Sequence, residues 1–155
     1  MRIRLLAVGS KMPAWVEEGV KTYRKRLPRD FSLEIEEIAL GQRGKNADIA
    51  KARAQEAQRI RDKLRGDEYV VALEVKGKPW TTEQLAQEAD GWRMSGRDIA
   101  LLVGGPDGLE PSLSAAADKT WSISPLTLPH PLVRIMLAEQ LYRAWTLLVG
   151  HPYHR

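Results

Sequence analysis

The chain has 155 residues, of which 43% are hydrophobic and 28% are charged, a composition typical of a globular protein with a buried core. It contains no cysteine, which excludes disulfides, zinc–thiolate sites and thiol catalysis, and no apolar stretch approaches the roughly 20 residues that a membrane span needs. We therefore expect a single cytoplasmic domain over residues 1–155, without a signal peptide or membrane contact. The net charge of +4 permits an RNA partner without requiring one.

The first part of the chain alternates between strand and helix patterns. A short apolar run predicts a strand over residues 3–8, and Pro13 suits the first turn of a helix that ends before Pro28. A second strand is expected over residues 33–38 because its apolar residues alternate with polar ones. One face of the intervening helix is predicted to carry the apolar residues Val16, Val20, Tyr23 and Leu27.

The same alternation continues after a loop at residues 41–45. Asn46 is expected to cap a helix that runs to residue 64, and residues 69–75 read as a strand buried on both faces. Thr81 or Thr82 suits the cap of a helix through residue 92. A strand over 99–103, a short helix over 111–117 and a last strand over 121–123 follow. The order predicts an α/β fold with a mostly parallel sheet and helices on both faces.

The last predicted helix, residues 131–149, is apolar almost all round. A helix in a small domain cannot bury two opposite faces in its own core, so we expect one face to pack against a second copy of the chain. Arg134 falls among these apolar residues, and its guanidinium must be paired with a protein carboxylate or meet an anionic ligand.

The strand at 99–103 ends abruptly in Gly104-Gly105-Pro106-Asp107-Gly108. Glycines let a backbone lie close to a ligand, and open α/β sheets place their sites at the carboxyl ends of strands. The spacing is neither a dinucleotide fingerprint nor a phosphate-binding loop, and no G-x-S-x-G elbow occurs. The three histidines have no ligand spacing on a helix, so we expect no metal site. Taken alone, the segment could be a plain turn.

Together with other motifs, this turn resembles the RlmH family, the large-subunit ribosomal RNA pseudouridine N3-methyltransferases of the SPOUT class. The resemblance covers the whole chain and includes the following motifs: Gly41-x-Arg43-Gly44-Lys45-Asn46-Ala47-Asp48-Ile49, Gly77-Lys78-Pro79-Trp80, Gly104-Gly105-Pro106-x-Gly108-Leu109, Leu126-Thr127-Leu128-Pro129-His130-Pro131-Leu132-Val133-Arg134, Glu139-x-Leu141-Tyr142-Arg143-Ala144-Trp145 and His151-Pro152-Tyr153-His154-Arg155. It implies a trefoil knot in the C-terminal part, S-adenosylmethionine as the methyl donor, a homodimer, and large-subunit rRNA as the substrate.

The resemblance also implies which residues serve the reaction. The cofactor would contact the following residues: Leu73, Gly104, Ile123, Ser124, Pro125, Leu126, Thr127 and Leu128. Candidates for the catalytic machinery, in a site built across the dimer, are His130, Glu139, Arg143, Tyr153, His154 and Arg155. Which of them acts as the general base stays open. His130 could instead be a turn or cap residue, and Glu139 with Arg143 a plain surface pair.

Basic residues offer candidate contacts to RNA on two segments. They are Arg24, Lys25, Arg26 and Arg29 on one segment, and Arg43 and Lys45 on the loop. The helix over residues 46–64 mixes basic and acidic side chains, which is typical of a solvated face. Because no RNA-binding domain is appended, we expect the substrate to be an assembled ribosome. Two alternatives are a ribosome-associated SPOUT-fold binding protein without activity and a SPOUT methyltransferase that acts on transfer RNA.

Overall fold

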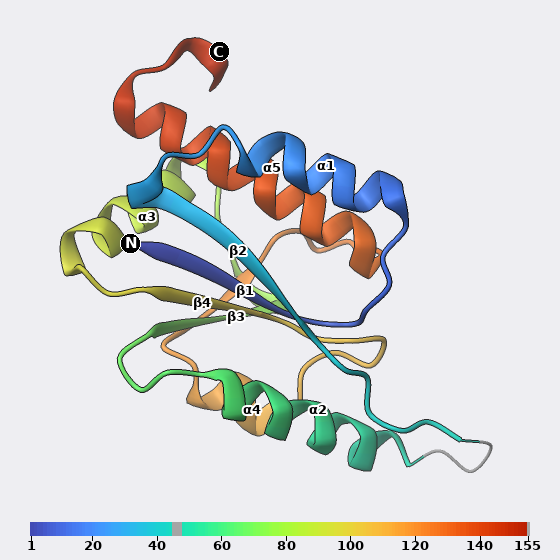
Figure 1. Ribbon diagram of the computed structural model, residues 1–155. Coiled ribbons are helices and arrows are strands. Elements are labelled where there is room, and N and C mark those ends of the chain that lie inside the picture. The colour runs from blue at the N-terminus through green and yellow to red at the C-terminus, as the bar shows by residue number, and fades with distance from the viewer. Residues whose placement is uncertain (45–47, 155) are drawn as a thin grey trace.

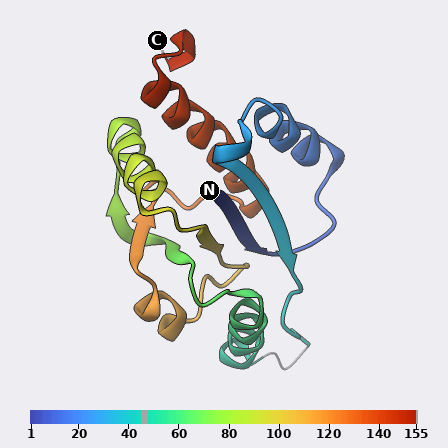
Figure 2. The same cartoon turned by 60° about the vertical axis from the view of Figure 1, so that its left-hand side comes forward.

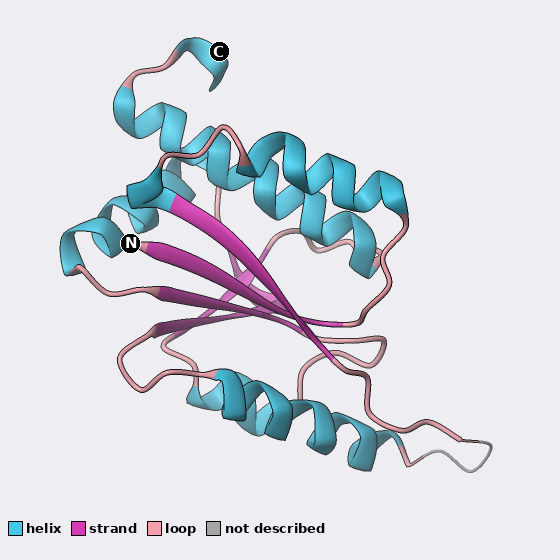
Figure 3. Ribbon diagram, viewed as in Figure 1, coloured by secondary structure: helices cyan, strands magenta, loops and turns pink. Residues whose placement is uncertain are grey.

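The computed structural model of the chain describes residues 1–44 and 48–154. Its strands are β1 (Arg2–Val8), β2 (Ser32–Ile38), β3 (Tyr69–Pro79), β4 (Ile99–Val103) and β5 (Lys119–Ser122). Its helices are α1 (Ala14–Arg24), α2 (Ile49–Lys63), α3 (Thr82–Ser95), α4 (Pro111–Ala116) and α5 (His130–Val149), with short 3-10 turns η1 (Arg29–Phe31) and η2 (Pro152–His154). Figure 3 shows how these helices and strands succeed one another.

The strands form one sheet in the order β2-β1-β4-β3-β5, and every pairing between neighbouring strands is parallel. Helices α1, α3 and α5 cover one face, and α2 and α4 cover the other (Figures 1 and 2). Each face has its own apolar core, the larger one beneath α1, α3 and α5. The predicted α/β class is confirmed, whereas the trefoil knot stays a prediction. None of the described helices is long and apolar enough to cross a membrane.

Strand β3 differs from its prediction in length and burial. It continues to Pro79, but only Val71 and Ala72 are fully buried, and Val75 is 52% exposed. The reason is that β4 pairs with β3 only as far as Ala72, and the pairing with β5 shifts between Leu73 and Lys78. The expectation of a strand buried on both faces therefore holds only at Val71 and Ala72, and beyond them the strand no longer pairs with β4 and becomes available to a site.

Several element ends also differ from the predictions. Pro13 is the N-cap of α1 and lies outside its first turn, while Leu27 follows the helix and still packs against the core. Asn46, the predicted cap of α2, lies outside the described residues; there the side chain of Asp48 accepts a hydrogen bond from the Lys51 amide at 3.1 Å. Thr81, one of the two expected caps of α3, forms a capping box with Gln84.

The ends of the later elements shift by one to three residues. β5 spans Lys119–Ser122, which leaves Ile123 in the following loop, and α5 begins at His130. α3 continues to Ser95, and α2 ends at Lys63.

Helix α5 lies between α1 and α3. Leu137, Leu141 and Ala144 are buried on its inner face. Arg134 is 4% exposed; it donates one hydrogen bond to Glu37 Oε2 and one to the carbonyl of Gly9, both at 3.1 Å. The expected pairing of this guanidinium is met by the chain itself, which ties the second turn of α5 to the carboxyl ends of β1 and β2.

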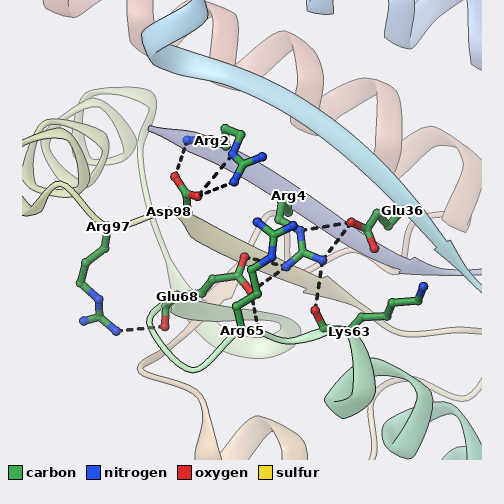
Figure 4. Close-up of polar contacts among 8 residues, drawn as sticks. All are labelled: Arg2, Arg4, Glu36, Lys63, Arg65, Glu68, Arg97 and Asp98. Atoms are coloured by element: carbon green, nitrogen blue, oxygen red, sulfur yellow. Dashed lines mark hydrogen bonds and ion pairs between the residues drawn. The ribbon is translucent and has the colours of Figure 1, made fainter.

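A buried ionic network lies at the opposite, amino-terminal edge of the sheet (Figure 4). Arg4 on β1 is 2% exposed and donates to both oxygens of Glu68, at 2.6 and 2.8 Å, and to Glu36. It also donates to the carbonyl of Lys63 at the end of α2. Burial alone would lower the pKa of the Arg4 guanidinium, but the hydrogen bonds to the two carboxylates outweigh it and raise the pKa. The network fastens α2 and the loop after it to β1, far from the carboxyl edge.

Candidate functional site

A cavity of about 410 Å³ opens at the carboxyl ends of β3, β4 and β5. Three segments line it: residues 73–75 where β3 leaves the ladder, the turn after β4, and the loop that leads from β5 into α5. Its walls are mostly apolar, as in sites for small organic ligands. This is the edge at which open α/β sheets bind their ligands.

The structure gathers the residues predicted to hold the cofactor around this cavity, with one exception. Those that line it are Leu73, Gly104, Ile123, Ser124, Leu126, Thr127 and Leu128. Pro125 is exposed and lies outside the lining. The predicted cofactor set did not include further lining residues, namely Glu74, Val75, Val103, Gly105, Pro106, Gly108, Pro129 and Val133, although the last five lie in motifs that the sequence singled out. Six of the eight lie within two positions of a predicted residue, so extending each segment by one or two positions would have found those six.

The glycine turn after β4 forms one wall of the cavity. A Cβ atom on Gly104 would lie 2.4 Å from the carbonyl carbon of Gly108 and 2.5 Å from the amide nitrogen of Leu109. The Gly108 amide donates to the Gly105 carbonyl at 3.1 Å, and Gly108 itself has a φ of +78°. The turn can fold this tightly only because its residues lack side chains at the crossing point.

Arg43 fastens this turn from outside. Its Nε donates to Asp107 at 3.0 Å and its Nη1 to Glu56 at 2.6 Å, and Glu56 also accepts the Gly41 amide at 2.9 Å. Glu56 is 3% exposed on α2. The hydrogen bond to Glu56 is the largest cause that raises the pKa of the Arg43 guanidinium, and burial opposes it. Arg43 was expected to contact RNA, but its side chain is engaged with two carboxylates of the chain; Lys45 lies outside the described residues.

His130 lines the cavity as the first residue of α5. Its ring packs against Gly9, where a Cβ atom would come within 3.2 Å of the ring carbon Cε1. Burial, followed by the charge of Arg134, lowers the pKa of the imidazole below its ordinary value of 6.5. The N-cap of α5 is Pro129 and no side chain caps the helix, so the alternative interpretation of His130 as a cap is wrong.

The other candidate catalytic residues gather along the second half of α5, from Glu139 at its middle onward. Arg143 Nε donates to Glu139 Oε1 at 2.9 Å, and the Tyr153 hydroxyl donates to the same oxygen at 3.2 Å. The Arg143 guanidinium lies 5.1 Å from the centre of the Tyr153 ring. His154 Nδ1 lies 3.3 Å from Thr146 Oγ1, and Arg155 lies outside the described residues. The tail after α5 is thus folded back onto the helix by named contacts, and Glu139 with Arg143 is more than a surface pair.

Burial and a neighbouring negative charge raise the pKa of the Tyr153 hydroxyl to about 12. Burial contributes most, and the neighbouring Glu139 carboxylate adds to it because a second negative charge would be repelled. At neutral pH the hydroxyl therefore keeps its proton and acts as a donor.

Within one chain, the cavity and the tail lie apart along α5. His130 is at the first position of α5, which has 20 residues, and Tyr153 follows its last turn. The tail folds back along the helix, however, so that Tyr153 contacts Glu139, which lies about 14 Å along the axis from His130 at a rise of about 1.5 Å per residue. The structure therefore brings together the predicted cofactor residues with His130, and separately Glu139 and Arg143 with the tail, but it does not bring these two groups together in a single copy.

The basic side chains of α2 are partly committed to the chain's own surface. Arg59 donates to the carbonyls of Ala39 and Leu40, and Arg61 donates to Ser112.

In the described ranges, 1–44 and 48–154, no cluster of three or more His, Cys, Asp or Glu side chains could hold a metal ion.

Comparison with known proteins identifies the class of this fold. Residues 1–154 match the family model described as "Predicted SPOUT methyltransferase". The chain is 64% identical over 155 residues to a protein of Chromohalobacter salexigens named "Ribosomal RNA large subunit methyltransferase H", with 100% of both chains covered. Proteins of the same name from Hahella chejuensis and Pseudomonas putida (strain W619) are 61% and 59% identical over 155 residues, covering 100% of this chain and 99% and 100% of theirs.

Solved structures resemble the fold at much lower identity. A "Probable Methyltransferase" from Bordetella pertussis Tohama I superposes with a TM-score of 0.58 at 15% identity, covering 92% of this chain and 95% of its own. A "probable methylase family protein" from Haemophilus influenzae gives a TM-score of 0.54 at 12% identity, covering 99% and 70%. These likenesses concern the fold alone.

Proposed function

This chain belongs to the SPOUT methyltransferase family, and we propose that it transfers the methyl group of S-adenosylmethionine to N3 of a pseudouridine in large-subunit ribosomal RNA. The relatives with 59% to 64% identity over their full length carry the name of an rRNA large subunit methyltransferase. The observation that carries the proposal is the apolar cavity of about 410 Å³ at the carboxyl edge of the sheet, lined by the segments that the sequence singled out.

The cavity suits an adenosyl ligand. Leu73, Ile123, Leu126 and Leu128 offer an apolar slot for a flat ring, and the glycine turn presents backbone donors and acceptors to the ring edge. S-adenosylmethionine supplies a methyl group activated by its positively charged sulfur. The trefoil knot expected around this cavity is part of the proposal.

We assign the chain's own contribution mainly to positioning and electrostatics. Arg143 and Tyr153 present hydrogen-bond donors, and Tyr153 keeps its proton at neutral pH because its pKa is about 12. We therefore assign Tyr153 a donor role. The imidazole of His130 is neutral there because its pKa is lowered, so it can accept a proton. His154 and Arg155 complete the proposed machinery, and His130, Glu139 and His154 remain candidates for the general base.

The separation between cavity and tail supports a homodimer with a composite site. In this structure the tail is folded onto the middle of α5, where Tyr153 contacts Glu139 about 14 Å along the helix from His130, so it does not cover the cavity of its own chain. Large apolar side chains are exposed at Leu132 (40%), Val149 (48%) and Leu126 (70%), at both ends of α5 and beside the cavity. We propose that a second copy covers them and that each tail closes the cavity of the partner. The substrate is the assembled ribosome and the location is the cytoplasm.

Methylation of ribosomes tests the proposed activity directly. Ribosomes from a strain that lacks the gene should gain one methyl group on a large-subunit pseudouridine when incubated with the protein and S-adenosylmethionine, as located by mass spectrometry. Calorimetric titration of the protein with S-adenosylmethionine is the companion measurement. Absence of cofactor binding would favour the binding-protein alternative, and methylation of transfer RNA in place of ribosomes would favour the other.

The composite site has a test of its own. Deletion of residues 151–155 should leave cofactor affinity and melting temperature near wild type and reduce methylation by orders of magnitude, because it removes contacts made in the transition state. A heterodimer of this variant with a subunit whose cavity is blocked should recover part of the activity, since it pairs one intact tail with one intact cavity. If a verified heterodimer recovers none, each tail serves its own subunit.

A further inference from the structure

Aromatic rings extend the tail cluster from α5 onto α1. The ring of Tyr142 lies 4.6 Å from that of Tyr153 and 6.5 Å from that of Tyr23, measured between ring centres. Tyr142 is buried, whereas Tyr23 and Tyr153 are half-buried. Figure 1 shows α1 running alongside α5, so the last turn of α1 and the tail come to share one surface.

Arg26, just beyond the end of α1, lies on these rings. Its guanidinium carbon is 5.5 Å from the centre of the Tyr23 ring and 5.6 Å from that of Tyr142. Both distances are within the range in which a cation is attracted by the face of an aromatic ring. The residue is exposed to solvent, so the guanidinium is held in place by the rings while its donors stay accessible.

Among the described residues, Arg26 has no carboxylate partner, as is also true of its neighbours Lys25 and Arg29. Nowhere in residues 1–44 and 48–154 does a carboxylate lie within 4.0 Å of its guanidinium. By contrast, Arg143 is neutralised by Glu139, and Arg24 donates to the carbonyl of Leu33. The surface made by Tyr23, Arg26, Tyr142, Arg143 and Tyr153 thus carries two guanidiniums, only one of which has a carboxylate partner.

A guanidinium that is stacked on aromatic rings and has no carboxylate partner is suited to binding a phosphate. Its planar donors match phosphate oxygens, its weak hydration makes desolvation less costly than for a lysine, and the rings have already restricted its rotamers. The half-exposed rings beside it are of the kind on which unpaired RNA bases stack. A mobile surface lysine would supply the charge without this fixed geometry.

We propose, resting on the proposed function, that Arg26 binds a backbone phosphate of the substrate RNA next to the nucleotide that the tail covers. Tyr23 and Tyr142 hold its guanidinium in place for this contact. The RNA-binding surface therefore includes the end of α1, and Arg26 contributes to it separately from Lys25 and Arg29 on the same segment.

The salt dependence of ribosome recognition tests this contact. For ribosomes from a strain lacking the gene, KM should be measured at several potassium chloride concentrations and fixed magnesium. Loss of one phosphate contact lowers the slope of log KM against log salt by about 0.7 to 0.9. We expect Arg26→Gln to show this decrease, with KM raised about tenfold at low salt. Its cofactor affinity and melting temperature should match wild type.

Two further variants separate the contact from general charge and from structure. Lys21→Gln removes one exposed positive charge from α1 and should leave the slope unchanged. Arg26→Lys keeps the charge but loses the planar fork, so the slope should be retained while KM rises. An unchanged slope in Arg26→Gln, or an equal decrease in Lys21→Gln, would overturn the proposal. A wild-type protein that methylates no ribosomes would instead overturn the proposed function.

Discussion

Replacing Gly104 by alanine adds one methyl group at the tightest point of the cavity wall. The new Cβ would lie 2.4 Å from the carbonyl carbon of Gly108, whereas ordinary contacts begin at 3.4 Å. The turn must therefore open by about 1 Å at this point. Both nearest atoms, in Gly108 and Leu109, belong to the backbone, so no rotation of a side chain can relieve the overlap.

The magnitude follows from that displacement. Forcing an extra carbon into a packed site costs about 1 to 3 kcal/mol. A misplacement of about 1 Å in a binding wall can cost about a hundredfold in function. We expect the dissociation constant for S-adenosylmethionine to rise about a hundredfold, which corresponds to about 2.7 kcal/mol. Because the added atom meets the turn's own backbone, S-adenosylhomocysteine should weaken to the same extent.

Calorimetric titration with both ligands, together with thermal unfolding, measures this effect. Gly91→Ala on α3 is the matched control, since its Cβ would meet no atom within 4 Å. This control should bind as wild type does and gain about 0.5 to 1 kcal/mol of stability from helix propensity. A folded Gly104→Ala protein with wild-type affinity would refute the assignment of this turn to the cofactor.

Two other predictions follow from the contacts around the cavity. Asp107→Asn breaks the outer ion pair of Arg43, and a partly exposed pair contributes about 1 kcal/mol. Cofactor affinity should therefore fall about three- to tenfold in a calorimetric titration. Unchanged affinity would mean that the turn holds its shape without Arg43. His130 should titrate below pH 6.5 in an NMR experiment, and Arg134→Met should move its pKa upward because a neighbouring positive charge is removed. Since folding lowers this pKa, the free energy of unfolding should decrease as pH falls below 6.5, and titration of His130 at or above 6.5 in the wild type would contradict the burial argument.

The sequence predicted the succession of strands and helices because each element has a periodic pattern that local residues suffice to define. The alternation of apolar and polar residues predicted β2, and the helical spacing of Val16, Val20 and Tyr23 predicted α1. Element ends were less well predicted, since caps depend on a few competing side chains; α2 takes Asp48 as its cap. The burial of β3 was misjudged because it depends on how far β4 extends beside it, and no local pattern records that.

The sequence alone identified the glycine turn, the loop before α5 and the polar tail as parts of the candidate site. It did so because their residue types match the motifs of one family along the whole chain. Only the tertiary structure decided what each of them faces. It placed Arg43 on Asp107 and Glu56, Arg26 on the rings of Tyr23 and Tyr142, and the tail against Glu139 and Tyr142 on α5. These contacts join residues from different elements, and their distances are set by how the helices pack on the sheet.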